Sequence, residues 1–220
     1  MSGTIRVAKR RQRVRSPLLI ATTNTGKLAE LRALLSQTGV DLTDLRRLGI
    51  EISVPEEGAD YGENAVAKSL AYALASGLWT LADDTGLEVD ALGGAPGLRS
   101  ARLAEDDAAR RASLLQRLAR HPRPWEARFR CAVALASPDG ETAVGEGACL
   151  GEIIPVARGT NGFGYDPLFV VAGTGQTMAE LPFDVKNRLG HRAGAVEDLL
   201  SRLRRGALPN APLSGGSREL

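Results

Sequence analysis

The sequence predicts an α/β protein built around a mixed β-sheet. Short apolar runs of strand length alternate along the chain with longer stretches whose leucines and alanines recur at helical spacing. Between residues 127 and 135 the apolar side chains alternate with a period of two, as they do on a strand. The turn residues Pro138, Asp139 and Gly140 then allow residues 142–150 to return as an antiparallel partner, so the sheet cannot be purely parallel.

The first half of the chain contains alternating strands and helices. Residues 18–21 form an apolar run that breaks at a polar loop, and leucines at helical spacing follow over residues 28–35. A second strand is expected at residues 41–45, an alanine-rich helix at residues 65–75 that ends before Gly77, and a third strand at residues 79–82. Because this strand is expected to end directly at Asp83 and Asp84, both carboxylates should lie at a strand's carboxyl edge, where open α/β sheets bind ligands.

The second half is expected to add two helices, the hairpin and a shaped loop. Residues 106–120 have helical periodicity, which Pro122 and Pro124 end. After the hairpin, residues 158–167 are dense in glycine and carry an aromatic pair, and a short strand follows at residues 169–171. Residues 193–205 form the final amphipathic helix.

Composition favours one folded unit. The 220 residues are 43% hydrophobic and 25% charged, which is ordinary for a globular protein, and we expect the domain to span residues 17–205. Residues 1–16 form a basic arm that we predict to be disordered, although such an arm can also contact nucleic acid, and residues 206–220 are predicted to be a frayed tail. No apolar run approaches the ~20 residues of a membrane span. Only two cysteines are present, which fits a reducing cytoplasm.

The polar loop after the first strand is a candidate phosphate site. It places hydroxyls, an amide, a glycine and a lysine at a helix N-terminus, whose free backbone N–H groups suit phosphate. Its residues are Thr22, Thr23, Asn24, Thr25, Gly26 and Lys27. It is not a Walker A loop, because Ala21 and Leu28 stand where that motif needs Gly and Ser or Thr. Local composition alone is equally typical of a capped helix start.

Acidic residues form a candidate cation site. Asp83 and Asp84 are adjacent, and Glu56 and Glu57 lie in a loop that begins at Pro55. Magnesium prefers oxygen ligands and usually takes one or two carboxylates together with substrate phosphates. The alternative is that the aspartates cap the next turn and the glutamates are solvated.

Two later segments supply candidate nucleotide contacts. In residues 159–167 the glycines allow close backbone approach, and Phe163 or Tyr165 could stack on a base, although packing of both rings in the core is an equally good interpretation. Before the last helix, donors are concentrated at Lys186, Asn187, His191 and Arg192. Such donors favour a six-keto purine over adenine, whereas a basic helix start is otherwise ordinary surface.

Together, in this order, the four segments resemble the inosine triphosphate pyrophosphatase (Ham1-like, non-canonical purine nucleoside triphosphate pyrophosphatase) family. The similarity covers about residues 18–203. It is carried by Thr-Asn-Thr-Gly-Lys from Thr23, Asp-Asp-Thr-Gly-Leu-Glu from Asp83, Gly-Phe-Gly-Tyr-Asp-Pro from Gly162, and Lys-Asn-Arg-Leu-Gly-His-Arg from Lys186.

The resemblance implies a fold, a reaction and roles for these residues. The fold is an elongated mixed sheet flanked by helices, in two lobes with a central substrate cleft, commonly as a homodimer. Asp84 is the implied catalytic proton acceptor and binds Mg²⁺ with Glu56 or Glu57, while residues 22–27 bind the triphosphate. Further implied substrate contacts are Thr85, Phe163, Gly164, Tyr165, Asp166, Lys186, His191 and Arg192.

The expected function is therefore hydrolysis of non-canonical purine nucleoside triphosphates (ITP, dITP and XTP) to the monophosphate and pyrophosphate, in nucleotide-pool house-cleaning. Neither a membrane nor nucleic acid is an expected partner. Two alternatives stay open from the residues alone. One is a nucleic-acid or nucleotide-binding module that uses the basic arm, and the other is a house-cleaning pyrophosphatase of modified pyrimidine nucleotides.

Overall fold

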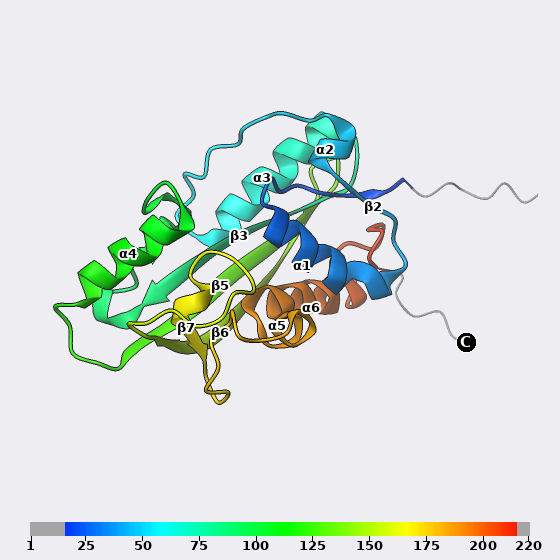
Figure 1. The fold of residues 1–220 in the computed structure, drawn as a ribbon. Coiled ribbons are helices and arrows are strands. Elements are labelled where there is room, and N and C mark those ends of the chain that lie inside the picture. Colours follow the sequence, from blue (N-terminus) through cyan, green and yellow to red (C-terminus); the bar gives the residue numbers. More distant parts are fainter. Residues whose placement is uncertain (1–15, 215–220) are drawn as a thin grey trace, which may run out of the picture.

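The computed structural model describes residues 16–214 and confirms the α/β class with a mixed sheet (Figure 1). Within these residues the sheet has seven strands in the order β2-β1-β3-β5-β6-β7, with β4 paired to β3. The strands are β1 (Leu18–Ile20), β2 (Leu42–Asp44), β3 (Thr80–Val89), β4 (Pro96–Gly97), β5 (Trp125–Ala136), β6 (Thr142–Ile153) and β7 (Phe169–Val171). Strand β1 runs parallel to β2 and β3, and every other pairing is antiparallel.

Helices cover both faces of the sheet. They are α1 (Thr25–Leu35), α2 (Leu45–Leu48), α3 (Tyr61–Ser76), α4 (Asp107–Leu118), α5 (Phe183–Leu189) and α6 (His191–Arg204). The side chains of β5 show how the faces are divided: Cys131, Val133 and Leu135 pack in the cluster that includes α1 and α6, whereas Ala132 and Ala134 face α3. This alternation follows from the period of two along a strand.

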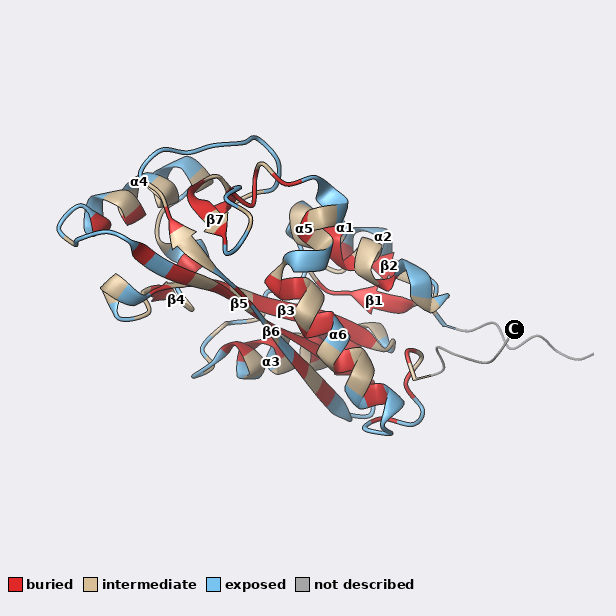
Figure 2. Ribbon diagram, turned by 90° about the horizontal axis from the view of Figure 1, so that it is seen from below, coloured by how far each residue is buried: buried red, intermediate tan, exposed pale blue. Residues whose placement is uncertain are grey.

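The apolar interior is divided along the length of the sheet. One large cluster joins β1, the end of β5, α1 and α6, and the other joins the start of β5, β7 and α4. Figure 1 shows α4 and β7 at one end of the molecule and α1, α2 and α6 toward the other, and Figure 2 shows buried residues running along the central strands. The elongated form with two lobes, expected from the resemblance, is therefore present.

Two glycines of β6 bring α6 close to the sheet. A Cβ atom at Gly145 would overlap backbone atoms of Ala195 and Leu199, and one at Gly147 would overlap the backbone of His191 and Ala195. Only glycine permits this backbone-to-backbone approach. As a result, the first turn of α6, which carries His191 and Arg192, lies directly against the sheet.

The structure corrects two expectations about boundaries. Strand β3 does not end at Ala82 but continues to Val89, because its ladder with β5 goes on after its pairing with β1 stops at Leu81. The frayed tail is wrong for residues 206–214, since Leu208, Ala211 and Leu213 are buried against the cluster of β1 and α6. All but the last residue of the predicted arm at residues 1–16, and residues 215–220 of the predicted tail, lie outside the described part of the chain.

Short elements that the sequence did not suggest also appear. Helices α2 and α5 are too short to produce a recognisable helical period. Across residues 16–214, none of the helices combines the length and the apolar character that a membrane crossing requires.

Candidate active site

Asp83 and Asp84 lie in the middle of β3, and their side chains point to opposite faces of the sheet. Asp83 contacts Lys27 of α1 and Arg192 of α6, whereas Asp84 contacts Asn64 and Lys68 of α3. Successive residues of a strand must diverge in this way. The expectation that two adjacent aspartates share one cation at a strand's end is therefore wrong, and each carboxylate belongs to a separate cluster.

Asp83 is the centre of a buried charge cluster, which we call the α1–α6 cluster. Its Oδ2 atom lies 3.1 Å from Lys27 Nζ and 3.1 Å from a guanidinium nitrogen of Arg192, and it accepts a hydrogen bond from Thr85 Oγ1 at 3.0 Å. Burial raises the pKa of Asp83, but the neighbouring cations Lys27 and Arg192 outweigh it and hold that pKa below the ordinary value. Asp83 is therefore an anion at neutral pH, and the cations Lys27 and Arg192 are arranged around it.

Glu30 extends this cluster toward the second half of the chain. It is a buried residue on α1, and its carboxylate forms ion pairs with Lys186 Nζ, at 2.7 Å, and with the guanidinium of Arg192. Lys186 in turn lies 2.5 Å from Asp166 Oδ2. Burial raises the pKa of Asp166, and the ammonium of Lys186 opposes that rise. The α1–α6 cluster is therefore Lys27, Glu30, Asp83, Asp166, Lys186 and Arg192.

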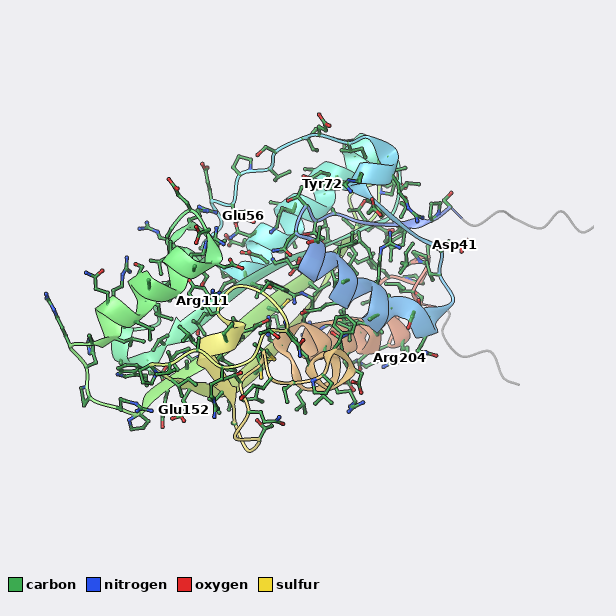
Figure 3. The ribbon with its side chains drawn as sticks, viewed as in Figure 1. Asp41, Glu56, Tyr72, Arg111, Glu152 and Arg204 are labelled. Carbon is green, nitrogen blue, oxygen red and sulfur yellow. The ribbon has the colours of Figure 1, made fainter. Side chains whose placement is uncertain are left out.

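The carboxylate cluster on the other face consists of Asp84 and Glu56 around Lys68. Lys68 Nζ lies 2.7 Å from Glu56 and 3.7 Å from Asp84, and Asn64 donates to Asp84 Oδ2 at 2.9 Å. Burial raises the pKa of Asp84 above its ordinary value, and Lys68 and Asn64 only partly oppose this. Burial also raises the pKa of Glu56, but its bonds to Lys68 and Arg102 give a net lowering. Figure 3 labels Glu56 in the segment that precedes α3.

These two carboxylates suit a hard cation. Among residues 16–214 no three carboxylate, thiol or imidazole side chains converge as a metal site. Magnesium does not need three, because it commonly takes one or two carboxylates and completes its shell with water and phosphate. Glu56 and Asp84 already share the cation of Lys68, so the donor set fits Mg²⁺. Glu57 is exposed and lines neither of the cavities described below.

The polar loop before α1 is a capped helix start. Asn24 is the N-cap and accepts from the backbone N–H of Lys27 at 3.0 Å, and Thr22 Oγ1 accepts from the N–H of Asn24 at 3.2 Å. Thr23, Thr25 and Gly26 line a cavity beside the helix. The helix N-terminus thus keeps its positive end toward that cavity.

The glycine-dense loop covers this helix start. The ring of Phe163 lies against Gly26, where an added Cβ would overlap it, and Lys186 Nζ is 4.6 Å from the centre of the ring. Asp166 Oδ2 accepts from the N–H of Phe163 at 2.9 Å, which closes the turn. Tyr165 is buried, and its hydroxyl donates to the carbonyl of Ser100 at 2.8 Å. Tyr165 is thus anchored in the core and borders only the inner of the two cavities described below, whereas Phe163 borders both.

His191 is a buried, neutral imidazole. Its ring stacks on Phe129 with 4.7 Å between centroids and 18° between planes. Burial, followed by the nearby cations Arg192 and Lys186, lowers the pKa of His191 well below 6.5. Its Nδ1 atom has no hydrogen-bond partner in the described structure. His191 lines the smaller of the two cavities described next, so it can offer a hydrogen bond to a ligand there.

Two adjacent cavities meet at Phe163. The inner cavity, of about 130 Å³, is lined by residues of both lobes, which include Lys27, Glu56, Asp84, Thr85, Lys186 and His191. The outer cavity, of about 600 Å³, is lined by the start of α1, residues 161–163 and Lys186. Asn24, Asp107, Phe163 and Lys186 border both. The arrangement offers cations and a helix N-terminus beside a carboxylate pair, which suits a phosphorylated ligand.

The model of the Ham1 family matches residues 18–202. The chain belongs to the Ham1 family. It is 44% identical over 192 residues to the dITP/XTP pyrophosphatase of Desulforamulus reducens, covering 86% of this chain and 96% of that protein. It is 42% identical over 185 residues to the dITP/XTP pyrophosphatase of Bacillus subtilis, covering 82% and 93%.

Solved structures agree with this membership. The Ham1 protein of Staphylococcus aureus superposes with a TM-score of 0.75 at 36% identity, covering 86% of this chain and 99% of that one. The structure titled nucleoside-triphosphatase / dITP/XTP pyrophosphatase from Mycobacterium abscessus has a TM-score of 0.65 at 43% identity and covers 80% and 95%. The Ham1 fold therefore accounts for most of the described part of the chain.

Most of the residues that the Ham1 resemblance singled out converge on the two cavities, with three exceptions. Glu57 is exposed and lines neither cavity. Thr22 only accepts from the N–H of Asn24 within the loop. Arg192 lines neither cavity, because it pairs with Asp83 and Glu30. Sequence reasoning missed Asn64 and Lys68. Their spacing of four residues on an alanine-rich helix was the available signal, since it places both side chains on one face.

Proposed function

We propose that this Ham1 family member hydrolyses non-canonical purine nucleoside triphosphates (ITP, dITP and XTP) to the monophosphate and pyrophosphate, with Mg²⁺ as cofactor. The observation that carries the proposal is the meeting of Lys27 and Lys186 with the Asp84–Glu56 carboxylate pair in one cavity. The dITP/XTP pyrophosphatases similar to this chain support the same reaction.

The triphosphate would bind at the start of α1. The free N–H groups there and Lys27 supply positive charge, and the outer cavity has room for an extended ligand. The inner cavity alone falls below the ~300 Å³ at which sites for drug-sized ligands begin. A nucleotide would therefore occupy both cavities, which meet at the ring of Phe163.

Asp84 would accept the proton of the attacking water. A carboxylate whose pKa is raised by burial is a better base than an exposed one, and Asn64 fixes its orientation. The water would attack the α-phosphorus, and pyrophosphate would leave. Mg²⁺, held by Glu56 and Asp84, would supply neutralisation of phosphate charge.

Selection of the base would rest on donors in the inner cavity. The Lys186 ammonium and the N–H of the His191 ring can donate to the carbonyl oxygen of a six-keto purine. The amino group of adenine is itself a donor, so it would face the Lys186 ammonium without an acceptor. A polar mismatch of this kind discriminates by up to roughly 10⁴-fold. ATP should therefore be a poor substrate.

The test is pyrophosphate release from a substrate panel, with Mg²⁺ and with a chelator in its place. ITP, dITP and XTP should be hydrolysed in the presence of Mg²⁺, ATP should react far more slowly, and the chelator should stop the reaction. Equal rates of pyrophosphate release from ITP and ATP would contradict the proposal. Faster reaction with modified pyrimidine nucleotides would favour the pyrimidine pyrophosphatase instead.

Assembly and location stay predictions. We propose a homodimer, from the family resemblance, and a cytoplasmic location. Cys131 and Cys149 are buried free thiols, which suits a reducing compartment. Light scattering of the purified protein tests the dimer, and a monomeric mass at micromolar concentration would contradict it.

A further inference from the structure

Helix α4, which packs in the lobe that contains β7, is hydrogen-bonded to the loop that carries Phe163. Asp107 and Arg111 lie one turn apart on α4, on the same face of the helix because their spacing is four residues. Asp107 Oδ2 accepts from the N–H of Gly164 at 2.7 Å, and Arg111 donates from its guanidinium to the carbonyl of Gly164 at 2.7 Å. Figure 3 labels Arg111 between α4 and this loop.

This contact fixes Gly164, which itself lines the inner cavity. Gly164 has a left-handed backbone (φ 62°) and follows Phe163 directly. The N–H of Phe163 is held separately by Asp166, which belongs to the α1–α6 cluster. The loop is therefore anchored from both lobes, by Asp166 on one side and by α4 on the other.

The carboxylate of Asp107 is itself held in place. Its Oδ1 atom accepts from Arg110 at 2.7 Å, and Arg110 also donates to the carbonyls of Ala104 and Glu105. The helix is fixed in its lobe by Leu114 and Leu118, which are fully buried. A rigid helix with an oriented carboxylate can thus set the position of the loop, rather than follow it.

We propose that Asp107 and Arg111 are positioning residues that hold the Phe163 loop over the nucleotide, so that they determine the KM for the nucleotide and not the rate of the phosphate chemistry. This inference rests on the proposed function. Neither side chain needs to touch the phosphorus or the attacking water. Their loss removes binding that is the same in the ground state and the transition state, which raises KM and leaves kcat unchanged.

The experiment compares Asp107→Ala with Asp106→Ala by steady-state kinetics on ITP and by thermal denaturation. Asp106 is the matched control, because it caps α4 by accepting from the N–H of Ala109 but makes no bond to the loop. Both variants should lose similar helix stability. Only Asp107→Ala should raise KM, by roughly five- to tenfold, as expected for a lost hydrogen bond to a carboxylate that is partly exposed.

Arg111 gives a second test that does not depend on Asp107. Arg111→Ala should raise KM in the same way, and Arg111→Lys, which keeps a donor, should restore part of it. Trypsin cleavage after the exposed Arg158, which precedes the loop, should become faster in Asp107→Ala than in Asp106→Ala, because the loop opens more often. This readout needs no substrate.

The outcomes separate the two proposals. If wild-type protein does not hydrolyse ITP, the proposed function fails, while the cleavage rates still test whether Asp107 and Arg111 hold the loop at Gly164. If wild type is active but Asp107→Ala has an unchanged KM and unchanged cleavage after Arg158, the positioning role is wrong. Equal increases of KM in Asp106→Ala and Asp107→Ala would assign the effect to helix stability and would also overturn it.

Discussion

Replacement of Asp83 by Ala should destabilise the protein strongly. The Asp83 side chain is 1% exposed and lies 3.1 Å from both Lys27 and Arg192, and the Arg192 side chain is 2% exposed. Removing one partner of a buried ion pair leaves an uncompensated charge and costs about 3–5 kcal/mol. For a domain of this size each kcal/mol lowers Tm by roughly 2–4 °C, so the melting temperature should fall by about 6–20 °C.

The assay is urea and thermal unfolding of Asp83→Ala beside Asp184→Ala. Asp184 pairs with Arg188 at 3.0 Å, a similar distance, but the two side chains are 70% and 66% exposed. An exposed pair of this kind contributes less than about 1 kcal/mol. A loss in Asp83→Ala no larger than that in Asp184→Ala would refute the argument that burial makes the Asp83 pairing structural.

Three other perturbations test other parts of the argument. Asp84→Asn should lower kcat by about 10²–10⁴-fold, as expected for loss of a general base, while the Kd for ITP measured by calorimetry stays within a few fold of the wild-type value. Near-normal turnover would contradict the role assigned to Asp84. Gly147→Ala should cost about 1–3 kcal/mol in urea unfolding, because its Cβ would overlap the backbone of α6, and an unchanged midpoint would contradict the close packing. The free energy of unfolding should fall as the pH drops below about 6.5, because His191 then takes up a proton in the unfolded state but not in the folded state, where its pKa is lowered. In His191→Phe this part of the pH dependence should be absent. The same pH dependence of stability in both proteins would contradict the prediction.

The strands and longer helices could be predicted because their signals are local. The alternating side chains of β5, the turn at residues 138–140 and the glycine that ends α3 each act over a few residues. The continuation of β3 through Asp83 and Asp84 could not be predicted in this way. Two charged residues in a central strand are tolerated only because partners far along the chain, such as Arg192, neutralise one of them.

The same limit applies to the candidate site. Family motifs pointed to Asp84, Lys27 and Lys186, but no motif indicated that Asp83 and Asp84 would serve different clusters. The period of two along a strand contains that information once β3 is known to continue, since neighbouring residues must face opposite sides. The burial of residues 206–214 could not be predicted either, because it depends on packing against distant elements and not on a local pattern. The composition of this segment suggests a loop, whereas three spaced apolar side chains find a tertiary partner.

The placement of Asp83 and Asp84 in separate clusters explains how the site can bind an anionic ligand. In the α1–α6 cluster three cations face three carboxylates; the cations are Lys27, Lys186 and Arg192, and the carboxylates are Glu30, Asp83 and Asp166. Arg192 is buried and stays on Asp83, so Lys27, which is more exposed, can turn toward a phosphate without leaving Asp83 unpaired. The cluster has no surplus positive charge for a triphosphate. Cations beyond it must supply the balance, and the Asp84–Glu56 pair, on the opposite face of β3, is where a divalent ion would add it.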